Sequence, residues 1–163
     1  MTVYLNIGTN IGNRYDNINR AIADILCTEI IDTESVKFSD IIESEAWGYE
    51  SSNDFLNIGI SFKLKSAIPL DDILKLFQQI EHEINGEYSH RDENSNYLDR
   101  ILDIDIIAID DIVYNSPKLV IPHPRMHLRR FVLEPMNQLD RNWVHPIFKK
   151  TAFQLMEELN SAE

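Results

Sequence analysis

Cysteine is nearly absent from this chain, which has Cys27 alone among its 163 residues. One cysteine cannot form an internal disulfide, and small secreted scaffolds normally depend on several bridges. Long apolar runs are also lacking: none approaches the ~20 residues of a membrane span, and residues 1–8 lack the basic start and apolar core of a signal peptide. We therefore expect a protein of a reducing compartment, the cytoplasm.

Basic residues are few, because 15 Lys and Arg stand against 27 Asp and Glu, a net charge of −12. This balance opposes general attraction to nucleic acid or to an anionic membrane, so we expect neither as a partner. No Pro-, Gly- or Ser-rich tract, repeat or low-complexity segment is present, and the length suits one hydrophobic core. We expect a single domain, residues 1–163, that is a monomer or weak homodimer.

Hydrophobic periodicity predicts a mixture of strands and helices. Period-two patterns predict strands near residues 2–8, 35–44, 54–65 and 101–109, the last turning at 110–111 into a short partner at 112–114. Helical spacing predicts helices over 14–26 and 69–84, the second ended by Asn85-Gly86. Short helices should follow from 122, the last near 151–159.

The order strand-helix-strand-strand-helix-strand predicts the fold class. It is the split βαβ pattern of a ferredoxin-like α+β sandwich, an antiparallel sheet with helices on its faces, here with added C-terminal helices. The longest irregular segment, residues 87–99, is polar and has the length of many active-site lids. We expect it to close over the ligands and exclude water.

Two aspartates, Asp103 and Asp105, interrupt an otherwise apolar strand. Side chains two apart in a strand share a face and lie roughly 6.6 Å apart along the backbone, so the carboxylates converge. Their repulsion favours a neutralising cation, and Mg²⁺ prefers such oxygen ligands. Ile107 and Ile109 are expected to continue this face, which favours a polar site on a packed face. The alternative is a solvated face of an antiparallel strand.

Basic side chains cluster late in this acidic sequence. Arg125 and Arg129 are four residues apart, so on a helix they would share a face and offer forked donors to phosphate. His123 and His127 have the same spacing, but Pro124 occupies the place of the glutamate in a zinc-protease motif, which weakens a zinc interpretation. The alternative, typical of charge runs, is a solvated helix face with surface ion pairs.

Aromatic residues occur in predicted loops or at their edges: Trp47, Phe55, Tyr97 and Phe131. Flat side chains there can stack on a flat heterocycle, and Asn57 can donate to and accept from its polar edge. Each aromatic residue alone is more often part of a core.

An ordered series of motifs resembles the 6-hydroxymethyl-7,8-dihydropterin pyrophosphokinase family, from the first strand to about Pro146. The matching segments are residues 7–12 (IGTNIG), 55–57 (FLN), 78–81 (QQIE), 100–105 (RILDID), and 120–123 (VIPH) followed by 129–131 (RRF). The resemblance implies a Mg²⁺-dependent transferase of folate biosynthesis. Such an enzyme moves pyrophosphate from its co-substrate ATP to the hydroxymethyl-dihydropterin and releases AMP.

The resemblance also implies roles for individual residues. Asp103 and Asp105 would hold two Mg²⁺ ions, and Arg100 would act catalytically at the site of transfer. Substrate-binding residues would be Ser44, Trp47, Phe55, Asn57, Tyr97 and Phe131, with Phe55 and Phe131 sandwiching the pterin. ATP-binding residues would be Gln78, Glu81, Lys118, His123 and Arg129.

One loop departs from the family pattern. Leu98-Asp99 stands where Gly-Pro is common, and Glu87 replaces the usual arginine. We expect Arg91 or His90 to supply the missing positive charge, and we favour Arg91, as a catalytic residue, because it is the only arginine in the loop.

Two alternatives to the enzyme remain open. The altered loop is compatible with a catalytically silent pterin- or nucleotide-binding module on the same fold. Composition alone would also allow an acidic interaction domain without a small-molecule site. The silent module gives no reason to retain both aspartates together with Arg100, so we favour the enzyme.

Overall fold

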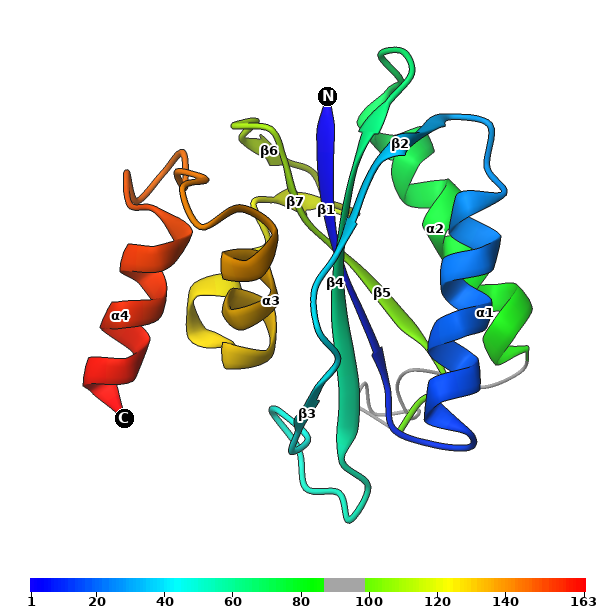
Figure 1. The fold of residues 1–163 in the computed structure, drawn as a ribbon, viewed down its shortest axis with the longest axis horizontal. Helices are drawn as coiled ribbons and strands as arrows, with labels where there is room; N and C mark the ends of the chain where they lie inside the picture. The colour runs from blue at the N-terminus through cyan, green and yellow to red at the C-terminus, as the bar shows by residue number, and fades with distance from the viewer. Residues whose placement is uncertain (87–98) are drawn as a thin grey trace.

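A five-stranded antiparallel sheet lies between two layers of helices (Figure 1). The computed structural model describes residues 1–86 and 99–163, and in it the strand order is β2-β4-β1-β5, with β3 also paired to β4. The sheet consists of β1 Thr2–Thr9, β2 Ile31–Phe38, β3 Ile42–Ser44, β4 Phe55–Leu64 and β5 Asp103–Ile109. A separate pair contains β6 Tyr114–Asn115 and β7 Val120–Ile121. The helices are α1 Arg14–Leu26, α2 Leu70–Asn85, the 3₁₀ helix η1 Met126–Leu128, α3 Arg130–Asp140 and α4 Ala152–Ala162.

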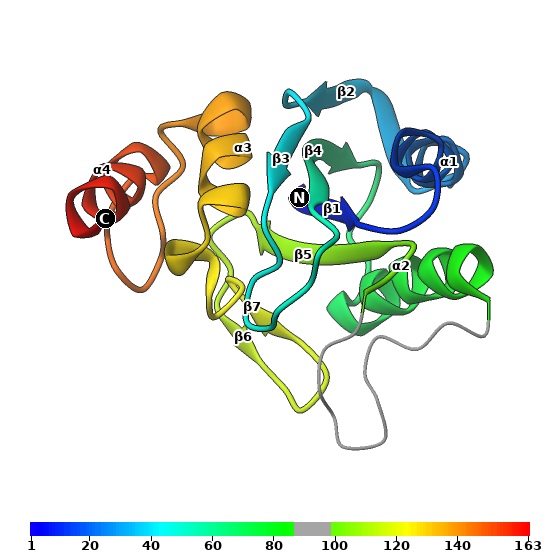
Figure 2. The ribbon, with the colours of Figure 1, turned by 90° about the horizontal axis from the view of Figure 1, so that it is seen from below.

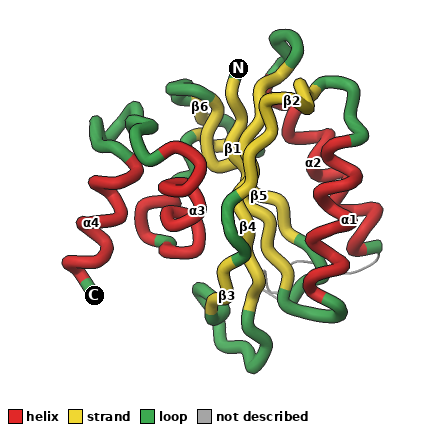
Figure 3. Tube along the Cα trace, in the orientation of Figure 1, coloured by secondary structure: helices red, strands yellow, loops and turns green. Residues whose placement is uncertain are grey.

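The helices form layers on opposite faces of the sheet. Helices α1 and α2 cover one face, while α3 lies on the other with α4 beyond it (Figures 1 and 2). Each side has its own core: Phe62 packs against Phe77 of α2 on the first, with ring centroids 6.2 Å apart, and Tyr4 approaches Trp143 at 6.3 Å on the second. The expected antiparallel α+β architecture is confirmed by the strand pairing. Figure 3 shows the helices in red on either side of the strands in yellow.

Helices α1 and α2 form where their apolar stripes predict them. Helix α1 begins after Asn13, whose side chain accepts a hydrogen bond from the Asp16 N–H at 3.1 Å. Helix α2 ends at Gly86, where φ is +60°, a value that suits glycine. In the part of the chain described, no helix is long and apolar enough to cross a membrane.

The single strand predicted over residues 35–44 is wrong, because β2 and β3 are two strands. Both pair antiparallel with β4. Between them, the Ser39 N–H donates to the Gly59 carbonyl at 3.0 Å, and the Ser39 hydroxyl accepts from the Gly59 N–H at 2.8 Å. A side chain thus replaces one backbone acceptor of the ladder, and the strand is interrupted there.

The partner strand predicted at residues 112–114 is also wrong. The chain turns away from β5 at Asp110, which has a φ of +46° and whose carboxylate accepts from the Thr2 N–H at 2.8 Å. Strand β6 pairs with β7 instead. The other edge of β5 receives the backbone of His123, whose N–H donates to the Ile107 carbonyl at 2.8 Å.

A bulge changes the face that the end of β5 presents. The register with β1 shifts at Tyr4, which leaves Ile107 as an extra residue in β5. Ile107 packs in the core beside α3, on the face of the aspartates, whereas Ile109 packs in the core beneath α1 and α2. The expectation for Ile107 is confirmed, and the one for Ile109 is wrong because a one-residue insertion reverses side-chain alternation.

Candidate active site

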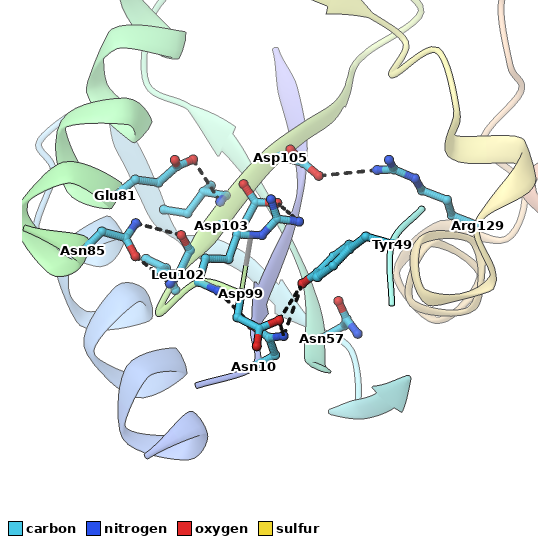
Figure 4. A network of polar contacts seen from close by, with 12 residues as sticks. Asn10, Tyr49, Asn57, Glu81, Asn85, Asp99, Leu102, Asp103, Asp105 and Arg129 are labelled. Carbon is cyan, nitrogen blue, oxygen red and sulfur yellow. Dashed lines mark hydrogen bonds and ion pairs between the residues drawn. The ribbon is translucent and has the colours of Figure 1, made fainter. Parts of the chain in front are cut away.

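Asp103 and Asp105 lie at the beginning of β5 with two arginines beside them, of which Figure 4 labels Arg129. Nη2 of Arg100 is 3.4 Å from Oδ2 of Asp103, and Nη1 of Arg129 is 3.8 Å from Oδ2 of Asp105. Both carboxylates retain partial solvent access, with side-chain exposures of 21% and 29%. Each aspartate is therefore paired with a cation yet remains accessible to a ligand.

Helix α2 holds this end of β5 in place through two side chains. Oε1 of Glu81 accepts from the Ile104 N–H at 2.9 Å. The side-chain amide of Asn85 donates to the Leu102 carbonyl at 2.8 Å and accepts from the Leu102 N–H at 2.9 Å (Figure 4). The aspartates thus project from a strand whose backbone is fixed on its α2 side.

The acidic pair has the chemistry of a cation site. Burial, and then the charge of Asp103, raise the pKa of the Asp105 carboxyl, while Arg129 and Arg100 oppose the rise. Within residues 1–86 and 99–163, no group of three or more His, Cys, Asp or Glu side chains is gathered to hold a metal. A divalent ion at this pair would complete its coordination with water or substrate oxygens, which fits Mg²⁺.

A first pocket opens on the α3 side of the aspartates. Most of the predicted pterin residues line it, and three further residues of its wall were not predicted. Its lining is Asn6, Gly8, Ser44, Glu45, Trp47, Phe55, Asn57, Arg100, Asp103, Asp105, Arg129 and Phe131. Aromatic walls, a buried amide and charged groups at one end suit a flat heterocycle with a reactive arm.

Asn57 presents the buried polar group of the first pocket. This residue is only 2% exposed, and its Nδ2 donates to the Ser44 hydroxyl at 2.8 Å. Gly8 on the neighbouring strand leaves room for this amide, because a Cβ at Gly8 would lie 3.1 Å from Oδ1 of Asn57. The hydrogen bond to Ser44 and the space left by Gly8 together orient the Asn57 amide toward the pocket.

Arginine side chains stack on the aromatic residues of the first pocket. The guanidinium carbon of Arg129 lies 4.5 Å from the Trp47 ring centroid and 5.5 Å from that of Phe131, and that of Arg100 lies 5.5 Å from the Phe55 ring. Such contacts keep the rings in place while the cations face the acidic end.

The prediction that Arg125 and Arg129 share a helix face is wrong. Arg125 precedes η1, and Arg129 has an extended backbone between η1 and α3, with φ −116° and ψ 106°. The two side chains still converge, since both lie over Trp47, at 5.8 Å and 4.5 Å from its ring.

A second pocket lies along the other edge of β5 and shares both aspartates with the first. It is lined by Leu74, Gln78, Glu81, Asp103, Ile104, Asp105, Ile106, Ser116, Pro117, Lys118, Leu119, Val120, His123 and Pro124. Four of the predicted ATP residues are therefore together, and the fifth, Arg129, lines the first pocket instead. Burial, and then the charge of Arg129, lower the pKa of His123 to about 4, so its imidazole is neutral at pH 7.

Several residues of the site were not predicted from the sequence. Asn6, Gly8 and Glu45 line the first pocket, and the Asn6 amide donates to the Phe131 carbonyl at 2.9 Å. A polar residue within a buried β1 was the available indication for Asn6. Asp99 binds the loop between β3 and β4, and nothing in its local sequence indicates those partners. Arg91 and Tyr97, which were predicted as site residues, lie outside the described residues, as do His90 and Glu87.

Sequence comparisons relate this chain to one family of proteins. A family described as 7,8-dihydro-6-hydroxymethylpterin-pyrophosphokinase (HPPK) matches residues 4–141. The chain is 35% identical over 149 residues to the 2-amino-4-hydroxy-6-hydroxymethyldihydropteridine pyrophosphokinase of Aquifex aeolicus, covering 91% of this chain and 86% of that protein. It is 37% identical over 150 residues to the protein of that name from Porphyromonas gingivalis, covering 88% and 93%.

Solved structures share the fold at low sequence identity. A crystal structure of an HPPK-DHPS in complex with substrates superposes with a TM-score of 0.70 at 12% identity. The match covers 99% of this chain and 43% of that longer protein, so the chain spans less than half of it. This likeness is evidence for the fold alone.

Proposed function

The chain belongs to the 7,8-dihydro-6-hydroxymethylpterin-pyrophosphokinase family, and from this premise we propose that it transfers pyrophosphate from ATP to the hydroxymethyl-dihydropterin where its two pockets meet. This reaction is the family's step in folate biosynthesis. We propose that the reaction takes place between the pockets because Asp103 and Asp105 line both of them. A donor in one pocket and an acceptor in the other would have their reacting ends at the same two carboxylates.

The first pocket is the proposed pterin site. Phe55 and Phe131 line it with the buried Asn57 amide, so a bicyclic ring could stack and present its polar edge to that amide. The proposed pterin site also includes Ser44, whose hydroxyl accepts from the Asn57 amide, and Trp47, whose ring contacts Arg129.

The second pocket is the proposed ATP site. Gln78, Glu81, Lys118 and His123 supply donors and acceptors, and Lys118 adds a positive charge suited to phosphate. Arg129 would reach the phosphates from the first pocket, beside Asp105. A neutral His123 is compatible with hydrogen bonding to either the base or a phosphate oxygen.

Asp103 and Asp105 are the residues that would hold Mg²⁺, and we propose two ions. When bound, the metal would neutralise charge on the triphosphate. Burial and the repulsion between the two carboxylates raise the pKa of Asp105 in spite of Arg129 and Arg100, and no third His, Cys, Asp or Glu ligand joins them among the described residues. Both observations support a site completed by phosphate and water.

The transfer itself requires positioning more than covalent help from the protein. The pterin hydroxymethyl oxygen attacks the β-phosphorus of ATP and forms a new O–P bond as its proton is released. The bond from the β-phosphorus to the oxygen that bridges to the α-phosphate breaks, and AMP leaves with that oxygen. Arg100, which forms an ion pair with Asp103, would stabilise negative charge on the transferring group.

The fold that we propose is ferredoxin-like. The order β1-α1-β2-β4-α2-β5 and the strand order β2-β4-β1-β5 support it, with β3 an additional short strand and η1, α3 and α4 a C-terminal addition. A single domain, a monomeric or weakly dimeric state and a cytoplasmic location stay predictions.

A nucleotide assay tests the proposed function. Incubation with ATP, the hydroxymethyl-dihydropterin and Mg²⁺ should yield AMP and the pterin diphosphate, and omission of pterin or Mg²⁺ should remove the AMP. Formation of ADP would contradict pyrophosphate transfer. Binding of both ligands by calorimetry without any AMP would favour the silent module over the enzyme.

A further inference from the structure

The Asp99 carboxylate gathers four hydrogen bonds from two distant segments of the chain. Its Oδ1 accepts from Asn10 Nδ2 at 2.8 Å, from the Tyr49 hydroxyl at 3.0 Å and from the Ser51 hydroxyl at 2.7 Å. Its Oδ2 accepts from Asn53 Nδ2 at 2.7 Å. Figure 4 shows Tyr49 and Asn10 converging on this carboxylate, just below the aspartates of the site.

This cluster is joined directly to the first pocket. Arg100, the next residue, lines that pocket and is paired through its backbone with Asn10: its N–H donates to Asn10 Oδ1 at 2.9 Å, and its carbonyl accepts from the Asn10 N–H at 3.2 Å. On the other side, the donors Tyr49, Ser51 and Asn53 belong to the loop between β3 and β4, which also contributes Glu45 and Trp47 to the pocket wall.

The loop between β3 and β4, residues 45–54, depends on side-chain contacts because it contains no helix or strand. Trp47 is held at one end by the Arg129 contact, and the Asp99 hydrogen bonds hold the other end. Hydrogen bonds to a carboxylate are stronger than those between neutral groups, and loss of this one acceptor removes all four of them at once.

The carboxylate is ionised in the folded protein at neutral pH. Burial raises its pKa, but the hydrogen bonds from Ser51, Asn53, Asn10 and Tyr49 outweigh burial and hold the pKa of Asp99 below its ordinary value. Burial, and then the bond to Asp99, raise the pKa of Tyr49 to about 12, so its hydroxyl remains a donor.

We infer that Asp99 is a positioning residue for the pterin: it fixes residues 45–54 against the first pocket before substrate binds, so that Trp47 and Glu45 are already in place. The inference rests on the proposed function of that pocket. The Asn10 N–H donates to the Arg100 carbonyl through backbone atoms alone, so this link does not depend on the Asp99 carboxylate. Loss of the carboxylate therefore affects capture of the pterin more than the transfer step or ATP binding.

Steady-state kinetics of Asp99→Ala test this role. The KM for the pterin should rise about tenfold or more, the change expected from losing about 1.4 kcal/mol of preorganisation. The KM for ATP should change less than about twofold and kcat less than about threefold, since neither depends on the loop in this proposal. Asp99→Asn should recover most of the pterin KM, because its carbonyl oxygen can still accept the three bonds made to Oδ1. Equal increases of both KM values, or an unchanged pterin KM, would overturn the inference.

Hydrogen exchange without substrate provides a readout separate from catalysis. Amides of residues 45–54 should exchange about tenfold faster in Asp99→Ala, less so in Ser51→Ala, and unchanged in Asp111→Ala, an exposed acidic control. Amides of β4 should keep their protection, which shows that the variant is folded. A wild-type protein that makes no AMP would overturn the proposed function, whereas unaltered exchange in Asp99→Ala overturns this inference whatever the activity.

Discussion

The arrangement of Asp103 and Asp105 that we propose for metal binding is unfavourable for folding. Two carboxylates on one face of a strand repel each other, and the pKa of Asp105 is raised by burial and by Asp103. A group whose pKa is higher in the folded than in the unfolded state destabilises the fold once the pH exceeds both values. Stability is therefore lower at alkaline pH than it would be with a neutral residue at Asp105.

Replacement of Asp105 by asparagine should separate activity from stability. Asp105→Asn should reduce kcat/KM by about 10²–10³, the scale of losing one electrostatic contact to a developing charge. Its free energy of unfolding at pH 8 without metal, measured in urea, should equal or exceed the wild-type value because the repulsion is gone. Asp111→Asn is the matched control and should change neither. A parallel loss of stability and activity would instead indicate a structural role for Asp105.

At the scale of elements, helix α3 contributes a residue to the first pocket and packs directly on the sheet. It begins with Arg130-Phe131, and Phe131 lines the first pocket. Its Pro135 and Leu139 pack over Gly59 of β4, where a Cβ would lie only 2.7 Å from Cβ of Pro135 and 3.0 Å from Cδ1 of Leu139. The close approach of α3 to the sheet thus depends on a missing side chain.

Gly59→Ala should push α3 away from β4. We expect a loss of about 1–3 kcal/mol in the free energy of unfolding, typical of overpacking, measured by urea denaturation. The KM for the pterin should rise as well, because Phe131 moves with α3. Lys63→Ala, at an exposed position of the same strand, is the control and should stay within about 0.5 kcal/mol of wild type. Wild-type stability in Gly59→Ala would show that α3 can shift without penalty.

The loop that joins α3 to α4 is organised by a buried histidine. Nδ1 of His145 accepts from the Ile147 and Phe148 N–H groups, both at 3.2 Å, and the residue is 3% exposed. Burial, and then the neighbouring His127, lower the pKa of His145 to about 4. Since the ordinary value is 6.5, the unfolded state takes up this proton first, and stability falls as the pH drops from about 6.5 toward 4.

His145→Asn should weaken this pH dependence. The asparagine carbonyl can accept the same two N–H groups but does not titrate. Between pH 7 and pH 4.5 the variant should lose up to about 3 kcal/mol less stability than the wild type, as measured by urea denaturation at each pH. Other groups titrate in both proteins, so the comparison isolates His145. Identical pH profiles would show that His145 keeps an ordinary pKa.

Predictability from sequence also differs between elements. Helices α1 and α2 were predicted because their stripes and end residues are local, and the aspartate face followed from the period of a strand. The break at Ser39, the bulge at Ile107 and the pairing of β6 with β7 depend on a partner strand that no local pattern specifies. The same holds for Asp99, because three of its four donors come from a loop some fifty residues earlier and the fourth is Asn10.

At the scale of the whole molecule, positively charged side chains gather around the site although the protein is acidic. The chain carries −12 overall, yet Arg100, Arg129 and Lys118 line the two pockets around the aspartates. A triphosphate entering this site meets these cations but also two carboxylates and a negative protein. The cations present balance the aspartates more than the phosphates, so a bound divalent cation should be needed for tight nucleotide binding.

Thermal unfolding measures this requirement directly. At about 100 times the dissociation constant, a ligand adds about 2.7 kcal/mol, which for a protein of this size corresponds to a rise in Tm of roughly 5–10 °C. ATP with Mg²⁺ should produce this shift, and ATP with EDTA should produce less than about a quarter of it. AMP with Mg²⁺ is the control: without the β- and γ-phosphates the metal has little to bridge, so its shift should remain small. If ATP stabilises the protein equally with EDTA, the aspartates bind no metal during nucleotide binding, and their pairing with Arg100 and Arg129 would then be their whole electrostatic role.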